Sequence, residues 1–101
     1  FLKGLQATKE KDGSLLDHTL VLYGSGMNNG MGLEDGDGSH STRKLPILFA
    51  GGRKLGIKQG QHLVYKNDVT PLCNLHLTML QAMGIERERF VDGTSRLKGL
   101  M

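Results

Sequence analysis

The most regular hydrophobic pattern in the chain lies between residues 71 and 83. Apolar side chains recur there at intervals of three and four residues, as one face of a helix requires. They are Leu72, Leu75, Met79, Leu80 and Met83. Thr70 is placed to act as the N-cap, Pro71 suits the first helical position, and Gly84 suits the end of the helix. The pattern therefore predicts a helix over 71–83.

Two short apolar runs have the composition of strands. The first spans 19–23 and is bounded by Gly24, and its unbroken apolar character predicts a strand buried on both faces, as in a parallel sheet. The second spans 45–50 and ends at a pair of glycines, so Pro46 is expected near its start or on a sheet edge. Residues 61–65 form a weaker third candidate for a strand.

Residues 1–11 predict a further helix, because Phe1, Leu2 and Leu5 share a face opposite several charged side chains. An Asp-Gly pair follows and is expected to end that helix. Between the first two strands, residues 24–38 hold six of the fifteen glycines, which predicts a long irregular loop. The order of helix, strand, loop, strand, strand-like segment and helix predicts an α/β fold with a sparse sheet.

Composition limits the size and kind of protein. The chain has 101 residues, of which 38% are hydrophobic, 23% are charged and 5% are aromatic. This length allows one domain, and the apolar content is too high for a disordered chain. No apolar run is long enough for a transmembrane helix. Because the chain opens on Phe1 and not on Met, we expect it to be a processed protein or the tail of a longer one.

Charge and cysteine content narrow the function classes. Thirteen Lys and Arg against ten Asp and Glu give a net charge of +3, and the basic residues stand in scattered pairs without interleaved aromatics. Modules that bind nucleic acid concentrate their charge and offer stacking rings, so no nucleic-acid partner is predicted. The single Cys73 excludes an internal disulfide, and its place in the predicted helix indicates an inert thiol.

Three motifs near the glycine-rich loop fall short of known sites. The glycines that follow strand 19–23 do not have the dinucleotide-binding spacing, and no P-loop lysine follows them. Ser25 lacks the G-x-S-x-G elbow of serine hydrolases. The acidic stretch that includes Asp35 and Asp37 lacks the glutamate that an EF-hand needs at its twelfth position. Nucleotide binding, serine hydrolysis and an EF-hand are therefore not predicted.

His40 is the strongest candidate for chemistry. It ends the loop and precedes strand 45–50, near the rim where sites of α/β sheets gather. Asp35 and Asp37 are close enough in sequence to share a metal ion with it. The alternative is a solvated loop histidine. The remaining histidines are expected to be structural or exposed: His18, His62 and His76.

Stretches along nearly the whole chain resemble the HXXSHH domain family, a bacterial domain of unknown function that is abundant in planctomycetes and their relatives. The matching stretches are Asp12-Gly13-Ser14-Leu15-Leu16-Asp17, Leu20-Val21-Leu22-Tyr23-Gly24-Ser25-Gly26-Met27, His40-Ser41, 45–52, 60–63, 71–75, Leu80, Met83-Gly84 and Asp92-Gly93-Thr94-Ser95. They resemble the C-terminal part of such a protein. The H-x-x-S-H-H motif that names the family is absent from this chain, and the resemblance implies that it lies upstream of Phe1.

A more distant similarity is to the alkaline phosphatase and sulfatase superfamily. Its members have a buried strand that ends in an Asp-His metal pair, then a loop with a further histidine, a V-P-L-I-like strand and a helix. The corresponding features follow in the same order here: strand 19–23, His40, strand 45–50 and helix 71–84. Ser25-Gly26 stands where the Asp-His pair would be, so among the superfamily's metal ligands His40 alone maps onto this chain.

Together the resemblances imply an α/β fold in which residues 1–101 are the C-terminal portion of an alkaline-phosphatase-like three-layer sheet domain. They imply a secreted or periplasmic, metal-dependent hydrolase-like protein that acts on a phosphate or sulfate ester of a small molecule or glycan. A divalent metal (zinc, calcium or magnesium) would be held by His40 with Asp37, while no catalytic residue is assigned. The alternative is a non-catalytic binding protein of the cell envelope, which the missing Asp-His pair favours.

Overall fold

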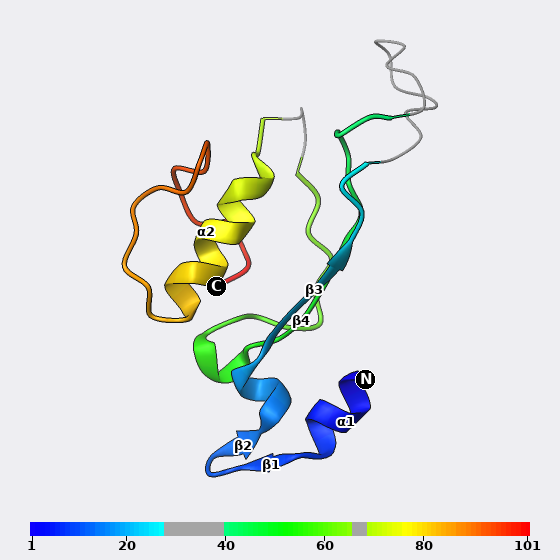
Figure 1. Ribbon diagram of the computed structural model, residues 1–101, viewed down its shortest axis with the longest axis vertical. Coiled ribbons are helices and arrows are strands. Elements are labelled where there is room, and N and C mark those ends of the chain that lie inside the picture. Colours follow the sequence, from blue (N-terminus) through cyan, green and yellow to red (C-terminus); the bar gives the residue numbers. More distant parts are fainter. Residues whose placement is uncertain (28–39, 66–68) are drawn as a thin grey trace.

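The computed structural model describes residues 1–27, 40–65 and 69–101 (Figure 1). In chain order, the elements in these ranges are the helix α1 (Leu2–Ala7), the strands β1 (Lys9–Glu10) and β2 (Gly13–Ser14), the 3-10 helix η1 (Leu15–His18), the strands β3 (Leu20–Gly24) and β4 (Ile47–Gly51), the 3-10 helix η2 (Arg53–Leu55) and the helix α2 (Leu72–Ala82). The described strands form two antiparallel pairs. The chain is therefore a small mixed α/β fold, which confirms the predicted class at this level.

The ladder of β3 and β4 is the central feature of the fold. The two strands run antiparallel, with Leu20 opposite Gly51 and Gly24 opposite Ile47. The expectation of a parallel sheet is therefore wrong. Parallel neighbours need a crossover connection, whereas antiparallel strands are joined at one end, and an apolar run does not distinguish the two cases. β4 begins directly after Pro46, as predicted.

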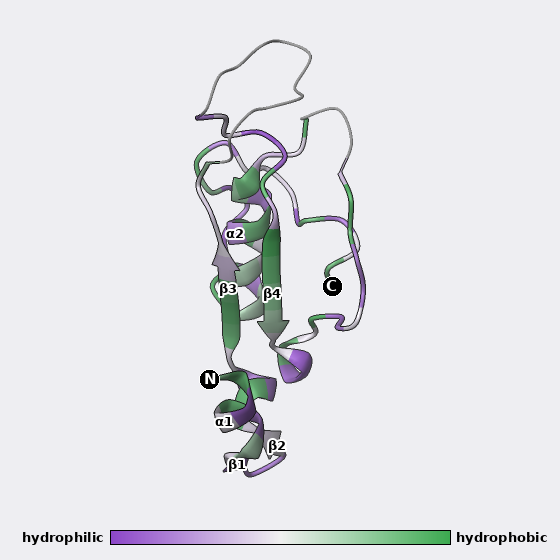
Figure 2. Cartoon of the chain, turned by 90° about the vertical axis from the view of Figure 1, so that its right-hand side faces the viewer, coloured by the Kyte–Doolittle hydropathy of each residue, from purple (hydrophilic) through white to green (hydrophobic). Residues whose placement is uncertain are grey.

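The two faces of this ladder differ in burial. Leu20, Ile47 and Phe49 pack against the hydrophobic core, whereas Tyr23 and Leu48 on the other face are 74% and 71% exposed. Side chains alternate between the faces of a strand, so both sets belong to the same continuous apolar run. Figure 2 shows β4 as hydrophobic along its length, although only one of its faces is covered by α2. The expectation that strand 19–23 is buried on both faces is therefore wrong as well.

The core lies between the ladder and α2. Its buried members are Ile57, Leu75 and Leu100. Partly buried hydrophobic side chains surround them: Leu20, Ile47, Phe49, Leu63, Met79, Ala82, Leu97 and Met101. These residues come from β3 and β4, from the segment between η2 and α2, from α2 and from the C-terminal segment 83–101, so the core joins parts of the chain that are distant in sequence.

The helix α2 agrees closely with the prediction of a helix over 71–83. Pro71 directly precedes it with an extended backbone, and no side chain caps its first turn, so Thr70 is not the N-cap. At the other end, Gly84 has a positive φ of 80°, and its N–H donates to the carbonyl of Gln81 at 3.1 Å. A glycine in this left-handed conformation ends a helix at little steric cost, which confirms the predicted stop.

The segment that follows α2 folds back onto a second face of the helix. The amide of Thr94 donates to Asn74 Oδ1 at 3.1 Å, and the amide of Leu97 donates to Thr78 Oγ1 at 2.7 Å. The same Thr78 hydroxyl donates to the carbonyl of Asn74 at 2.7 Å, so this fully buried group has both of its partners. One turn further on, Arg96 Nε donates to Gln81 Oε1 at 2.7 Å. Side chains of α2 therefore accept hydrogen bonds from backbone amides of the C-terminal segment, which forms no strand that could pair them.

The N-terminal region departs from its prediction. The expected helix over 1–11 ends at Ala7, because Lys9–Glu10 pairs with Gly13–Ser14 in a short hairpin. The Asp-Gly pair that was expected to end a helix instead belongs to this hairpin, with Asp12 in its turn. Turn chemistry and helix termination use the same residue types, so composition does not separate them.

Residues 61–65 do not form the predicted third strand. Side chains attach this segment to the C-terminal region instead: Gln61 Nε2 donates to the carbonyl of Gly99 at 2.9 Å, and the Tyr65 hydroxyl donates to the carbonyl of Lys98 at 2.6 Å. Within the ranges that the structure describes, no helix is long and apolar enough to cross a membrane.

Candidate functional site

The predicted site at His40 lies beyond the end of the ladder at which β3 stops and β4 starts. Gly24 and Ile47 are ladder partners, so segments 25–27 and 40–46 extend from the same end, which we call the loop-side end (Figure 1). His40 is exposed there and is followed by the fully buried Ser41. Asp35 and Asp37, its predicted neighbours, lie outside the described residues.

Ser25 occupies the position at which the predicted resemblance would require an Asp-His pair. Its hydroxyl donates to the carbonyl of Met27 at 2.7 Å and accepts from the amide of Met27 at 3.3 Å. These bonds form a local turn of the kind that serine hydroxyls commonly stabilise. The side chain therefore shapes the backbone after β3, and the structure gives it no neighbouring base that would activate it as a nucleophile within ranges 1–27, 40–65 and 69–101.

The donor set for a metal is incomplete in the part of the chain that the structure describes. No three His, Cys, Asp or Glu side chains come together there. His40 is a single candidate ligand, whereas catalytic zinc sites use three protein ligands and calcium sites use more. The described residues do not by themselves fit a divalent metal, and no chemical step through one follows from them.

The other histidines occupy separate elements. His18 is in η1, and its Nε2 lies 2.9 Å from Asp12 Oδ1, an ion-pair distance without hydrogen-bond geometry, so this nitrogen has no hydrogen-bond partner among the described residues. His62 is exposed in segment 61–65. His76 on α2 packs edge-on against Phe90, with ring centroids 6.0 Å apart. These positions agree with the structural or exposed roles predicted for them.

Cys73 lies in the first turn of α2, inside the predicted helix, and is partly buried. The neighbouring Asp92 carboxylate and then burial raise the pKa of the Cys73 thiol above its ordinary value. The thiolate is the reactive form of cysteine, so a raised pKa favours the inert role that the sequence predicts for Cys73.

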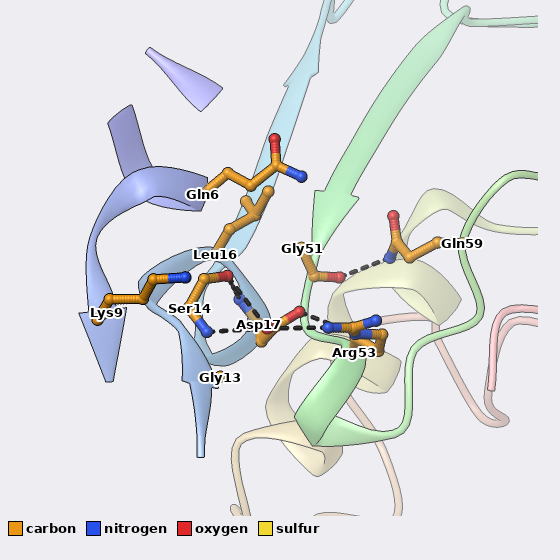
Figure 3. Close-up of a pocket in the computed structure, with 9 residues that line it drawn as sticks. All are labelled: Gln6, Lys9, Gly13, Ser14, Leu16, Asp17, Gly51, Arg53 and Gln59. Atoms are coloured by element: carbon orange, nitrogen blue, oxygen red, sulfur yellow. Dashed lines mark hydrogen bonds and ion pairs between the residues drawn. The ribbon is translucent and has the colours of Figure 1, made fainter. Parts of the chain in front are cut away.

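A hollow of about 470 Å³ lies at the opposite end of the ladder (Figure 3). Its polar lining consists of Gln6, Lys9, Ser14, Asp17, Arg53 and Gln59, which come from α1, the β1–β2 hairpin, η1, η2 and the residues that follow η2. We call it the Arg53 hollow. None of these residues was predicted as a candidate site.

Asp17 organises the Arg53 hollow. Its Oδ2 accepts from the amide of Ser14 at 2.9 Å and from the Ser14 hydroxyl at 3.1 Å, and the same hydroxyl caps η1 by accepting from the amide of Asp17. Arg53 then donates from Nε to Oδ1 at 2.9 Å and from Nη2 to Oδ2 at 3.2 Å. The spacing Ser14-x-x-Asp17 is a readable cap signal. Arg53 is 36 residues away in sequence and carries no such signal.

Asp17 also makes the stability of the chain dependent on pH. The hydrogen bond from Arg53, followed by that from the Ser14 amide, lowers the pKa of Asp17 from 3.8 to about 2. A carboxylate whose pKa is lower in the folded state stabilises that state above its ordinary pKa, and this contribution disappears as the pH falls through its folded pKa. We therefore expect the urea concentration at the midpoint of unfolding to decrease as the pH is lowered from 4 to 2.

This expectation is tested by urea titrations from pH 6 to pH 2. Asp17→Asn should be less stable at pH 6 and should lose less stability than the parent chain between pH 4 and pH 2. Glu88→Gln, which alters an exposed carboxylate after α2, is the matched control and should keep the parent's dependence. If the urea midpoints of the parent and of Asp17→Asn fell by the same amount between pH 4 and pH 2, the ion pair of Asp17 and Arg53 would not be the source of the pH dependence.

Comparisons with protein-family models, with curated proteins and with solved structures find no match to this chain. The resemblances to the HXXSHH family and to the alkaline phosphatase superfamily therefore stay predictions. The structure places the predicted ligand His40 in a segment that leaves the same end of the ladder as the turn of Ser25, whereas Asp37 lies outside the described residues. The Arg53 hollow lies at the other end of the ladder.

Proposed function

We propose that the chain is part of a secreted or periplasmic hydrolase-like protein that binds a phosphate or sulfate ester at the loop-side end of the β3–β4 ladder. The proposal includes the alkaline-phosphatase-like three-layer architecture that the resemblance implies. The observation that carries it is the pairing of Gly24 with Ile47, because this register brings the end of β3 and the segment of His40 to one end of the ladder. Ligands of α/β sheets commonly bind beyond the ends of strands.

In this proposal, His40 offers an exposed imidazole beside the position at which the ester binds. A neutral imidazole is a common ligand of divalent metals, and zinc, calcium or magnesium would require further ligands besides it. Asp37 is the sequence-predicted partner. Ser25 contributes its hydroxyl to the turn after β3, so its proposed role is to set the backbone at the rim of the site.

The test measures the metal content and the ester turnover of the full-length protein to which the chain is proposed to belong. We expect bound divalent metal by elemental analysis, together with hydrolysis of p-nitrophenyl phosphate or p-nitrophenyl sulfate that a chelator abolishes. His40→Ala should lower the bound metal and the turnover at least tenfold. His62→Ala removes an exposed histidine outside segments 25–27 and 40–46 and should change neither. Equal metal content and turnover in the parent and His40→Ala would exclude a role for His40.

A second candidate function is non-catalytic binding on the same fold. The hydrogen bonds between Ser25 and Met27 favour it, because they use the position of a missing metal pair to stabilise a turn. This alternative predicts ester binding without turnover in the full-length parent protein. Turnover that a chelator removes would contradict it, so the same measurements distinguish the two functions.

A further inference from the structure

We propose that the Arg53 hollow binds a small polar molecule through a phosphate or sulfate group. This site lies at the opposite end of the β3–β4 ladder from His40, and it does not depend on the function proposed for the loop-side end. The inference rests on the size of the hollow, on the balance of charge along its walls and on the way in which Asp17 holds Arg53.

The size of the hollow suits a small molecule. Its volume of about 470 Å³ falls within the range of about 300–1,000 Å³ that is usual for small-molecule sites. Figure 3 shows Lys9 and Gln6 on one side, Arg53 and Gln59 on the other, and Ser14 and Asp17 between them. Two positively charged side chains therefore lie on opposite walls.

The charges along the walls favour an anion. Lys9 and Arg53 carry two positive charges, and Asp17 carries one negative charge. The oxygens of Asp17 already accept four hydrogen bonds, two from Ser14 and two from Arg53. A bound cation would have to compete with these donors for a single carboxylate. An anion is instead attracted by the net positive charge of the lining.

Unused donors remain after the internal bonds are made. A guanidinium has five N–H groups, and Arg53 directs two of them at Asp17. The side chains of Lys9 and Gln6 make no hydrogen bond or ion pair within the described part of the chain, and Gln59 uses its Nε2 on the carbonyl of Gly51 at 2.6 Å. The hollow therefore offers an ammonium, a guanidinium edge and an amide for the oxygens of one ligand.

The Asp17–Arg53 pair prepares the site before a ligand arrives. Two parallel hydrogen bonds define the plane of the guanidinium, although the Arg53 side chain is 70% exposed. A fixed planar fork loses less conformational entropy on binding and matches the oxygens of phosphate or sulfate. Lys9 adds a mobile point charge from the opposite wall, and Ser14 holds Asp17 in place. These features select a tetrahedral oxyanion over an apolar or cationic ligand.

The test is a titration of the 101-residue chain with inorganic phosphate and, separately, with inorganic sulfate, followed by the amide resonances in two-dimensional NMR. Chloride replaces the added anion so that ionic strength stays constant. We expect saturable shifts that are centred on Ser14, Asp17, Gly51 and Arg53. Lys9→Gln should weaken this binding at least fivefold. Lys11→Gln removes the same charge two residues away, outside the lining, and should weaken it less than twofold.

Two further variants separate this site from the loop-side end. Arg53→Lys keeps the charge beside Asp17 but removes the planar fork, and it should weaken binding at least threefold while the dispersed spectrum of the folded chain persists. His40→Ala should leave the affinity unchanged. Three results would overturn the proposal: no saturable shifts around the hollow, equal weakening by Lys9→Gln and Lys11→Gln, or loss of binding in His40→Ala alone.

Discussion

Gly51→Ala is expected to lower the free energy of unfolding by about 3 kcal/mol or more, one of the largest effects of a single methyl group in this chain. Gly51 ends β4 with a positive φ of 85°, a conformation that side-chain-bearing residues rarely adopt. An added Cβ would overlap the carbonyl oxygen of Thr19 and would stand 2.7 Å from that of Leu16. Both neighbours are backbone atoms, so they cannot move aside as a flexible side chain would.

The measurement is thermal unfolding followed by circular dichroism. For a domain of this length, the expected loss lowers the melting temperature by about 12 °C or more. Gly4→Ala is the matched control, because Gly4 lies in α1 and an added Cβ there meets no atom within 4 Å. Alanine also has the higher helix propensity, so the control should be neutral or slightly more stable. Similar melting temperatures for Gly51→Ala and the parent would contradict the backbone geometry described for β4.

Leu77→Ala is expected to cost about 2–5 kcal/mol of unfolding free energy, the usual range for truncating a buried leucine. Leu77 is fully buried in α2, between Asn74 and Thr78, the two residues that accept from amides of the C-terminal segment. The loss has two sources, the removed apolar contact and the cavity that remains. A chain of this length has a total stability of about 5–15 kcal/mol, so the variant is expected to be partly unfolded at 37 °C.

Urea unfolding at 25 °C measures this loss. Leu72→Ala is the control on the same helix, since Leu72 is 39% exposed at the first position of α2, and it should cost less than about 1 kcal/mol. If both variants were equally stable, the burial described for Leu77 would be wrong. Should Leu77→Ala fail to fold at all, the milder Leu77→Val should still be less stable than Leu72→Ala.

The sequence predicted the elements whose characteristic residues lie within the element or next to it. α2 has apolar side chains at helical spacing and a glycine directly after its end, and both signals lie within the helix or next to it. The positions of β3 and β4 were also predicted, because short apolar runs between glycines are typical of strands. The direction of pairing was not predictable, since it depends on contacts between segments that are far apart in sequence.

Elements whose identity depends on a partner were missed. Segment 61–65 has the apolar residues of a strand, but the groups that it meets are carbonyls of residues 98 and 99. Lys9–Glu10 continues the pattern of a helix, but it pairs with β2. The same reason explains the Arg53 hollow. Ser14 and Asp17 form a motif that can be read locally, whereas Arg53 joins them only when η2 folds against η1.

The helix α1 has no buried side chain, yet it supplies Gln6 to one wall of the Arg53 hollow. Segments with few buried contacts open locally at small free-energy cost, while the amides of a buried helix such as α2 exchange with solvent only through larger openings. Fraying of α1 would therefore remove one wall of the hollow without unfolding the ladder. A ligand that contacts both this wall and η2 would slow the hydrogen exchange of the α1 amides. The exchange rates of α1 would therefore report whether the hollow is occupied, although α1 contains neither Lys9 nor Arg53.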